Sequence, residues 1–369
     1  MQVTLYYQEG TSDKVYHIEK KASGNGYVVN TAHGRRGSTL ISGTKTAQPV
    51  TEAEADDIFE DLVKAKKKKG YEGDVSNKSF SVPAGSGQSA NLNLQLLNPI
   101  SEEKLDELFG NEQFGAQEKL NGRRLALVAT ATEVYGVNKS GVRCGIPESF
   151  SAAMKTICQA LNYDELIVDG EAIGEEYFAF DLIQINRENW RTFGFEVRWI
   201  KLNDLLGAAR QRSGNSLLKR FHINALVLGE SEKRRLCEML NNAGLEGIVF
   251  KDLKAVYTAG RPNSGGSQFK YKFYEEATCR VAGLNGSKRS VKLQVRNEDG
   301  TFRDIGNCAI PVNKSVPAAG DLVEIRYLHA FPNGSLYEPI FKEARTDQRE
   351  ADLYSTLKFK PQNSDDEED

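Results

Sequence analysis

A polar segment near residue 80 limits how much of this chain can belong to one folded unit. The stretch "EGDVSNKSFSVPAGSGQSANLN" is rich in Gly, Ser and Asn, a composition typical of linkers between domains. A chain of 369 residues also suits two or three domains. The segment therefore predicts a multidomain protein, with a small unit over residues 1–73, a flexible linker over 74–93 and the larger part of the chain after it.

The first unit has the pattern of a small sheet followed by a helix. Apolar and polar residues alternate in "VTLYYQ", "KVYHIEK" and "GYVVNTAHGRRGST". The next stretch, "TEAEADDIFEDLVKAKKKKGY", has Thr51 as a cap, acidic residues in its first turns, lysines in its last turns and Gly70 as its end. These features predict a small α+β domain.

The remainder mixes helices and strands before it becomes entirely β-like. We expect a short helix in "SEEKLDELFG", capped by Ser101, and helices around 201–212 and 231–243. Strands are predicted in "RRLALVAT", "EVYGV", "LIVDGEAI", "YFAFDLI", "GIVFK" and "QFKYKFY". Short β-like runs separated by Gly, Asn and Pro turns fill 278–345 and predict a small closed barrel. The fold class is therefore multidomain α+β, with expected domains at 94–277 and 278–358.

The composition favours a cytoplasmic protein without a membrane segment. No run of about 18 apolar residues is present, and the start "MQVTLYYQEG" lacks the pattern of a secretory signal. The five cysteines are scattered and never at CxxC spacing, which predicts reduced thiols without structural zinc: Cys144, Cys158, Cys237, Cys279 and Cys308. The four histidines are equally dispersed, so a histidine-bound metal is not expected.

The charge is unevenly distributed along the chain. The formal net charge is −3, but the final "SDDEED" carries five acidic residues, so the rest of the chain has a net charge of +2. We expect 359–369 to be an acidic, disordered tail. Local basic faces elsewhere could still bind nucleic acid.

Four short motifs place charged residues on or beside apolar strands. Lys119 precedes an Asn-Gly pair, a pattern that taken alone is most typical of a hairpin turn with exposed charges. In "VDGEA", Asp169 and Glu171 are two residues apart on one strand face and could hold Mg²⁺. The strand "EGIVFK" begins with a carboxylate and ends with a lysine. In "FKYKFY", Lys270 and Lys272 share one face and the aromatic residues share the other.

Together, these motifs suit a site in which a lysine attacks a phosphate. A nucleophilic lysine must lose its proton, and nearby cations favour that loss. Lys270, Lys272 and a divalent metal held by Glu171 and Glu246 would supply such cations. The same charges would bind a triphosphate and neutralise the transition state.

The motifs resemble those of the nucleotidyltransferase superfamily of ATP-dependent DNA ligases, RNA ligases and mRNA-capping enzymes. That family is marked by KxDGxR, a DGE strand, an aromatic-rich FD strand, an EGxxxK strand and a KxK strand, in this order. Here they stand as "KLNGRR", "VDGEA", "YFAFDLI", "EGIVFK" and "KYK", while "NKSG" occupies the place of an SRNG-like segment.

Position by position, the resemblance implies that Lys119 forms a lysyl-AMP intermediate. It implies that the nucleotide is bound by residues of the matching motifs: Glu118, Arg124, Lys139, Glu171, Phe180, Lys251, Lys270, Lys272 and Arg345. Phe180 would stack on adenine, Glu118 would help to read its edge, and Glu171 and Glu246 would hold Mg²⁺ or Mn²⁺.

Three departures from the family pattern stand out. Asn121 replaces the usual Asp, and Lys139 stands where the family often has an Arg, whose bidentate binding of phosphate a lysine does not reproduce. The segment "EARTDQRE" resembles the family's RxDK element, with Gln348 in place of Lys. This element favours DNA ligases and capping enzymes, since many RNA ligases lack the barrel that carries it.

The first unit resembles a WGR domain, the module found in poly(ADP-ribose) polymerases. The similarity rests on "SDKVYHIEK", "HGRRGS", where His33 replaces the Trp, and "KAKKKKGY". Such domains bind nucleic-acid ends, so phosphate contacts are implied for Arg35, Arg36, Lys45 and the lysines of 66–69. Lysines at a helix C-terminus are also favoured by the helix dipole alone.

The resemblances together imply a monomeric, ATP-dependent DNA ligase that seals nicked duplex DNA and serves DNA repair, replication or recombination. An NAD-dependent ligase would resemble a much longer chain with a zinc module. An RNA ligase would share the central domain, and a capping enzyme would use GTP. A nucleic-acid-binding module without catalytic activity is the alternative from a different class.

Overall fold

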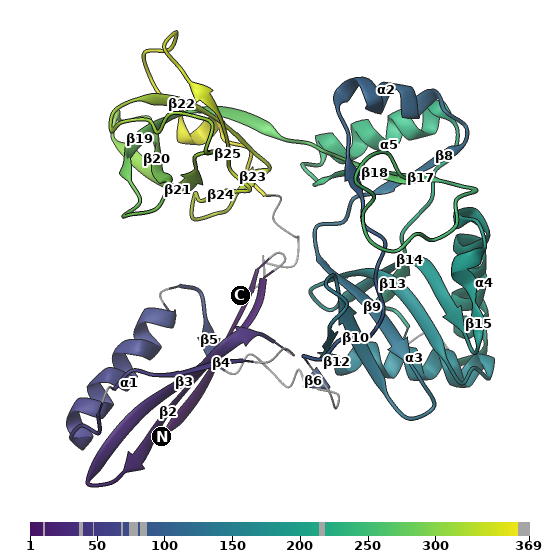
Figure 1. Ribbon diagram of the computed structural model, residues 1–369, viewed down its shortest axis with the longest axis horizontal. Coiled ribbons are helices and arrows are strands. Elements are labelled where there is room, and N and C mark those ends of the chain that lie inside the picture. Colours follow the sequence, from purple (N-terminus) through teal and green to yellow (C-terminus); the bar gives the residue numbers. More distant parts are fainter. Residues whose placement is uncertain are drawn as a thin grey trace.

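The computed structural model of the protein consists of three parts that follow one another along the chain (Figure 1). It describes residues 1–9, 12–36, 40–46, 48–67, 69–73, 80–81, 87–213 and 218–360. Within these ranges, no helix combines the length and the apolar character needed to cross a membrane.

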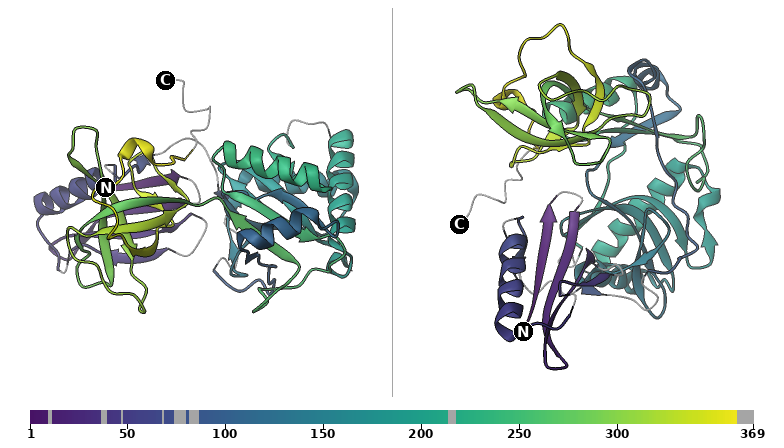
Figure 2. Two further views of the ribbon diagram at one scale, coloured as in Figure 1. Left: turned by 90° about the horizontal axis from the view of Figure 1, so that it is seen from above. Right: turned by 60° about the vertical axis from the view of Figure 1, so that its left-hand side comes forward.

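The N-terminal part is a five-stranded antiparallel sheet packed on one helix. The strand order is β4-β3-β2-β1-β5. The strands and the helix are β1 (Gln2–Glu9), β2 (Ser12–Ser23), β3 (Gly26–Arg35), β4 (Ile41–Thr44), β5 (Glu72–Gly73) and α1 (Glu52–Lys67). Leu5, Ile18 and Val29 of the sheet are buried with Ala55 and Phe59 of α1 in one small core. Figure 2 shows α1 on the side of the sheet that faces away from the central part.

The caps predicted for α1 are confirmed. Backbone N–H of Glu54 donates to the Thr51 hydroxyl at 3.3 Å, and backbone N–H of Thr51 donates to the Glu54 carboxylate at 3.0 Å. This reciprocal pair satisfies donors at the start of the helix. Gly70, just after the helix, has a φ of +78°, which glycine adopts without strain.

The central part contains two sheets, and the larger sheet has the order β11-β10-β9-β13-β14-β15, with β16 parallel to β14. Its strands are β9 (Arg123–Ala129), β10 (Val134–Asn138), β11 (Arg143–Cys144), β13 (Leu166–Ile173), β14 (Glu176–Ile185), β15 (Glu188–Asn189) and β16 (Phe221–Ile223). Helices α3 (Glu148–Leu161) and α4 (Phe195–Ser213) bury their apolar residues against this sheet, and η1 (Trp190–Thr192) precedes α4.

The smaller sheet has the order β7-β18-β17-β8. Its strands are β7 (Asn98–Pro99), β8 (Phe114–Glu118), β17 (Gly247–Asp252) and β18 (Gln268–Lys272). The core on one of its faces is completed by α2 (Glu102–Gly110) and α5 (Glu230–Asn242). The predicted cap of α2 is confirmed, since the Ser101 side chain accepts a hydrogen bond from backbone N–H of Lys104.

The C-terminal part is a five-stranded antiparallel sheet that curls around a single core (Figure 1). The strand order is β21-β20-β19-β22-β25. Its elements are β19 (Glu275–Leu284), β20 (Ser290–Arg296), β21 (Phe302–Ala309), β22 (Leu322–Tyr327), β23 (His329–Ala330), β24 (Leu336–Tyr337), β25 (Ile340–Ala344) and η2 (Tyr354–Thr356).

Part of the predicted linker is hydrogen bonded to the central part. Strand β6 (Phe80–Ser81) pairs with β12 (Ile146–Pro147). Backbone N–H of Ala90 donates to the Gly141 carbonyl at 2.8 Å, and Leu92 is buried beside the larger sheet. Residues 74–79 and 82–86 of the predicted linker, and most of the predicted acidic tail, lie outside the described residues. The proposed domain boundaries stay predictions.

Candidate active site

Lys119 lies where the chain crosses from the smaller sheet to the larger sheet. It follows β8, which pairs with β17, and precedes β9, which pairs with β10 and β13. The hairpin that the Asn-Gly pattern suggests is therefore wrong, because the flanking strands belong to different sheets. At Gly122 a β-carbon would lie 2.5 Å from the carbonyl oxygen of Ala172, so the crossing requires a residue without a side chain.

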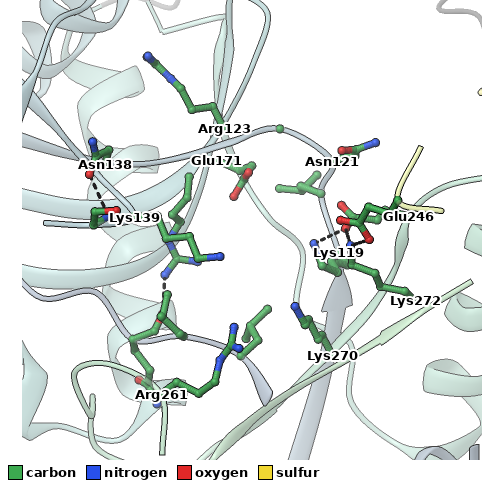
Figure 3. A pocket seen from close by; sticks show the side chains of 18 of the residues that line it. Lys119, Asn121, Arg123, Asn138, Lys139, Glu171, Glu246, Arg261, Lys270 and Lys272 are labelled. Atoms are coloured by element: carbon green, nitrogen blue, oxygen red, sulfur yellow. Dashed lines mark hydrogen bonds and ion pairs between the residues drawn. The ribbon is translucent and has the colours of Figure 1, made fainter. Parts of the chain in front are cut away.

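The Lys119 side chain lies in a cavity of about 380 Å³ that is dominated by charged groups (Figure 3). The basic residues of its lining are Arg35, Lys119, Arg123, Arg124, Lys139, Arg261, Lys270 and Lys272, and the acidic ones are Glu171, Glu246 and Glu338. The excess of cations suits a polyanion such as a chain of phosphates.

Glu246 connects two of the cavity lysines. Its Oε1 atom lies 2.7 Å from Nζ of Lys119 and 2.9 Å from Nζ of Lys272. Figure 3 shows this triad on the side of the cavity opposite Lys139 and Arg261. The amine of Lys119 is thus held in an ion pair, and it must leave this pair before it can act as a nucleophile.

The alternation predicted for β18 is confirmed. Lys270 and Lys272 line the cavity, while Phe269 and Phe273 are buried in the core under the smaller sheet. Burial, together with the charges of Lys119 and Lys272, lowers the pKa of Lys270 to about 8. An anion bound between these lysines would offset their mutual repulsion.

Glu171 and Glu246, the predicted metal ligands, both line the cavity. Burial raises the pKa of Glu171 to about 7, and the nearby charge of Glu246 contributes to the rise. Carboxylates that repel each other in this way fit Mg²⁺ or Mn²⁺, which accept water and phosphate oxygens as further ligands. In the described part of the chain, no group of three or more His, Cys, Asp or Glu side chains could hold a metal ion. A cation here would depend on the nucleotide for part of its coordination.

Asp169, which spacing alone suggested as a partner of Glu171 at Mg²⁺, has a different role. Its Oδ2 atom accepts hydrogen bonds from Arg124 at 2.7 Å and from the Tyr257 hydroxyl at 2.9 Å. The side chain is fully buried and does not line the cavity. Asp169 therefore orients Arg124 from behind the site, and the suggestion that it binds metal is wrong.

A second, smaller pocket adjoins Lys119 and has less charged walls. It is lined by Leu97, Gln117, Glu118, Lys119, Leu120, Arg124, Glu171, Phe180, Asn224, Val249 and Lys251. Burial raises the pKa of Glu118. Four apolar residues line it beside polar and charged groups, and an aromatic ring with such polar groups suits a planar ligand such as a purine.

Gln117 is a site residue that the sequence argument missed. Its side chain is almost fully buried and donates from Nε2 to the Asn224 carbonyl at 2.9 Å. Its Oε1 atom is buried and has no hydrogen-bond partner among the described residues. A ligand amino group would satisfy this acceptor. The sequence signal is an amide near the end of β8, after an apolar start and next to Glu118, for which the family resemblance implies a contact with the adenine edge.

Phe180 and Lys251 meet in the same pocket. The guanidinium of Arg124 stacks 4.3 Å from the Phe180 ring centroid, and Nζ of Lys251 lies 4.5 Å from it. Lys251 also donates to the Phe180 carbonyl at 3.3 Å. Burial lowers the pKa of Lys251 to about 7, so this lysine can be present in its neutral form near neutral pH.

Comparisons with known proteins concern the fold of the chain. Residues 1–78 match the family model of the WGR domain. A solved structure described as Pmar-Lig_Pre is 18% identical with a TM-score of 0.56, and the match covers 81% of this chain and 73% of that one. The chain combines a WGR domain with a DNA ligase fold.

Two further solved structures are similar to this chain. One comes from a study of Lig E DNA ligases and is 20% identical with a TM-score of 0.48, covering 69% of this chain and 99% of that one. The other is the ligase domain of LigD from M. tuberculosis, 17% identical with a TM-score of 0.42, covering 73% and 98%. No curated protein matches the sequence. The predicted multidomain α+β fold class is confirmed, and the part after the WGR domain is similar to the nucleotidyltransferase and OB-fold architecture of DNA ligases, from which we name its two domains.

The predicted nucleic-acid-binding residues of the WGR domain lie in three different settings. Arg35 lines the cavity around Lys119. Arg36 lies elsewhere, with its guanidinium 4.6 Å from the Tyr6 ring centroid. Lys45 belongs to a basic cluster with Lys14, Lys66 and Lys69. Burial and the charges of the other three lysines lower the pKa of Lys66.

Arg345 of the OB-fold domain is not brought into the cavity. Its guanidinium is bonded to Asp347 at 2.9 Å and to Glu324, and it lines neither of the two pockets next to Lys119. Its predicted contact with the nucleotide would need a different position of the OB-fold domain.

Proposed function

We propose that the protein is an ATP-dependent polynucleotide ligase that seals breaks between a 5′-phosphate and a 3′-hydroxyl in DNA through lysyl-AMP on Lys119. The observation that carries the proposal is the position of Lys119. It lies between a highly cationic cavity, which suits the phosphates, and a less charged pocket, which suits the purine.

In the first step, Nζ of Lys119 would attack the α-phosphorus of ATP. The new N–P bond would form as the bond to pyrophosphate breaks, and pyrophosphate would leave with the electron pair. Lys270 and Lys272 would neutralise the phosphate oxygens and favour loss of the Lys119 proton. A divalent cation held by Glu171 and Glu246 would supply additional charge neutralisation.

The remaining steps would use the same cavity. AMP would pass to a 5′-phosphate at a nick, and the 3′-hydroxyl of the neighbouring strand would displace it. Arg35, which the WGR domain places in the cavity lining, supports the view that a polynucleotide end is delivered there. The small pocket is compatible with adenine, since the buried Oε1 of Gln117 can accept a hydrogen bond from its amino group.

The decisive test is covalent labelling with ATP carrying label at either the α- or the γ-phosphate. We expect wild-type protein to retain the α-label after denaturation and to retain no γ-label. Lys119→Ala and Lys119→Arg should lose the label by at least about 100-fold. Lys155→Ala, which alters an exposed lysine on α3, is the matched control and should label normally. Label on the Lys119→Ala variant would contradict the assignment.

A chase separates the polynucleotide substrates. Labelled wild-type protein is mixed with nicked duplex DNA, nicked RNA or single-stranded RNA of the same sequence. We expect label to leave the protein and strands to be joined with nicked DNA. Transfer to RNA alone would identify an RNA ligase. Labelling by GTP in place of ATP would identify a capping enzyme, and no labelling would leave a binding module.

A further inference from the structure

A carboxylate of the OB-fold domain reaches into the cavity of the nucleotidyltransferase domain. Oε2 of Glu338 lies 2.7 Å from Nζ of Lys272 and accepts a hydrogen bond from the Tyr274 hydroxyl at 3.0 Å. Glu338 also lines both the Lys119 cavity and the neighbouring groove between the two domains. The contact therefore joins the barrel to the strand that carries the phosphate-binding lysines.

This contact extends the ion pairs that hold the nucleophile. Glu338 binds Lys272, Lys272 binds Glu246, and Glu246 binds Lys119. Although burial alone would raise it, the pKa of Glu338 is lowered by the hydrogen bond and charge of Lys272. The carboxylate is therefore held as an anion, in the manner of a phosphate oxygen beside the same ammonium group.

The backbone around Glu338 is held in a defined shape. Glu338 has a φ of +53°, in the left-handed region that residues other than glycine rarely adopt, and Pro339 follows it. The Tyr337 ring stacks on His329 with a centroid distance of 4.9 Å, and Leu336 pairs with Ala330. A loop in such a conformation presents its side chain in a fixed direction, and left-handed residues of this kind occur preferentially at functional sites.

We propose that Glu338 is a latch that occupies the phosphate site in the empty enzyme. Its carboxylate binds Lys272 in place of a substrate phosphate and holds the OB-fold domain against the nucleotidyltransferase domain. A phosphate that binds Lys272 competes with Glu338 for the same ammonium group and repels it, so substrate binding releases the barrel. The inference deepens the proposed function, because it rests on the phosphate-binding role assigned to Lys272.

Binding of pyrophosphate tests the latch without any chemical step. Glu338→Gln keeps the size of the side chain and its ability to accept from Tyr274, but removes the charge. We expect this variant to bind pyrophosphate about fivefold more tightly than wild type in calorimetric titrations at low salt. Glu343→Gln, which neutralises an exposed carboxylate on β25 of the same domain, is the matched control and should bind like wild type. Equal affinities of Glu338→Gln and wild type would overturn the proposal.

The position of the barrel provides a second, independent readout. Small-angle X-ray scattering should show that wild type becomes more extended when pyrophosphate is added, and that Glu338→Gln is already extended without it. Scattering of Glu338→Gln that matches ligand-free wild type would contradict the latch, whatever the affinities. A wild type that binds pyrophosphate but never becomes adenylated would instead reject the proposed function and leave the latch intact.

Discussion

At the scale of single residues, Glu171 couples the site to pH. Burial raises its pKa to about 7, so the carboxyl group is protonated in a growing fraction of molecules as the pH falls below that value. A proton and a divalent cation compete for the same oxygens. We expect the Mg²⁺ concentration for half-maximal labelling to rise about tenfold from about pH 8 to about pH 6.

The measurement uses labelling rates across a Mg²⁺ series at each pH, with ATP saturating. The half-maximal concentration is the useful quantity, because it separates metal binding from effects of pH on the maximal rate. A half-maximal concentration that is the same at both pH values would remove Glu171 from the metal site.

Charged residues on apolar strands were easier to predict as site residues than an uncharged amide. Charged residues on or beside apolar strands, such as Lys270, Lys272 and Glu246, stand out in a sequence. Each of them must either be exposed to solvent or have a partner of opposite charge. Gln117 does not stand out, since an amide is tolerated in many settings. Spacing likewise cannot show that Asp169 is bound by Arg124, because that contact joins β13 to β9.

At the scale of elements, side-chain caps made α1 and α2 predictable, whereas α5 was predicted although its N-cap, Gly229, makes no side-chain cap hydrogen bond. Thr51 and Ser101 marked the starts of α1 and α2. Helix α3 was missed because it follows Pro147, which makes no side-chain cap hydrogen bond, and ends at Asn162 in a left-handed conformation. The crossing at Gly122 was also hidden, because an Asn-Gly pair is compatible with a hairpin and with a close crossing alike.

A buried lysine contributes to the contact between α2 and α5, beside their shared apolar core. Lys233 of α5 is fully buried, and its Nζ donates to the carbonyl oxygens of Leu108, Asn111 and Phe114 at 2.8 to 3.1 Å. These carbonyls lie at the end of α2 and the start of β8, so Lys233 completes the C-terminus of α2 from another helix. Burial lowers the pKa of Lys233, whereas the three carbonyl acceptors around its ammonium group favour the charged form.

Lys233→Met should therefore destabilise the nucleotidyltransferase domain by about 3 kcal/mol, because it leaves buried carbonyls without donors. Urea denaturation followed by fluorescence measures the change. Arg235→Met, at an exposed position of the same helix, is the control and should change stability by less than about 0.5 kcal/mol. Equal unfolding midpoints for Lys233→Met and the control would show that α2 does not depend on this contact.

At the scale of the whole molecule, all three domains contribute to one cavity. The WGR domain supplies Arg35, the OB-fold domain supplies Tyr337 and Glu338, and the nucleotidyltransferase domain supplies the remaining groups. Periodicity and composition predicted the separate domains, but not this convergence. Contacts between domains depend on side chains such as Glu338. The sequence does not show that Glu338 contacts Lys272, because the two residues lie in different domains.

The basic cluster of the WGR domain allows polynucleotide binding to be separated from nucleotide chemistry. Lys14, Lys45 and Lys69 are exposed and surround Lys66, whose ammonium group lies 3.7 Å from the Tyr16 ring centroid. Three lysines that each neutralise one phosphate release three counterions, so their loss should reduce the salt dependence of binding. The plot of log affinity against log salt has a negative slope. The triple change of these lysines to Gln should make this slope shallower by about 2 to 3 units.

Fluorescence anisotropy with nicked duplex DNA across about 50 to 200 mM salt measures this slope. Self-adenylation of the same variant should match wild type, because none of the three lysines lines the Lys119 cavity. Changing Lys155, Lys219 and Lys314 to Gln removes the same charge from exposed positions outside the WGR domain and should leave the slope unchanged. If both triple variants make the slope equally shallower, binding follows total charge, and the WGR domain is not where the polynucleotide binds. If only the WGR variant does so, and its adenylation is intact, then the domain holds the polynucleotide while Lys119 carries the nucleotide.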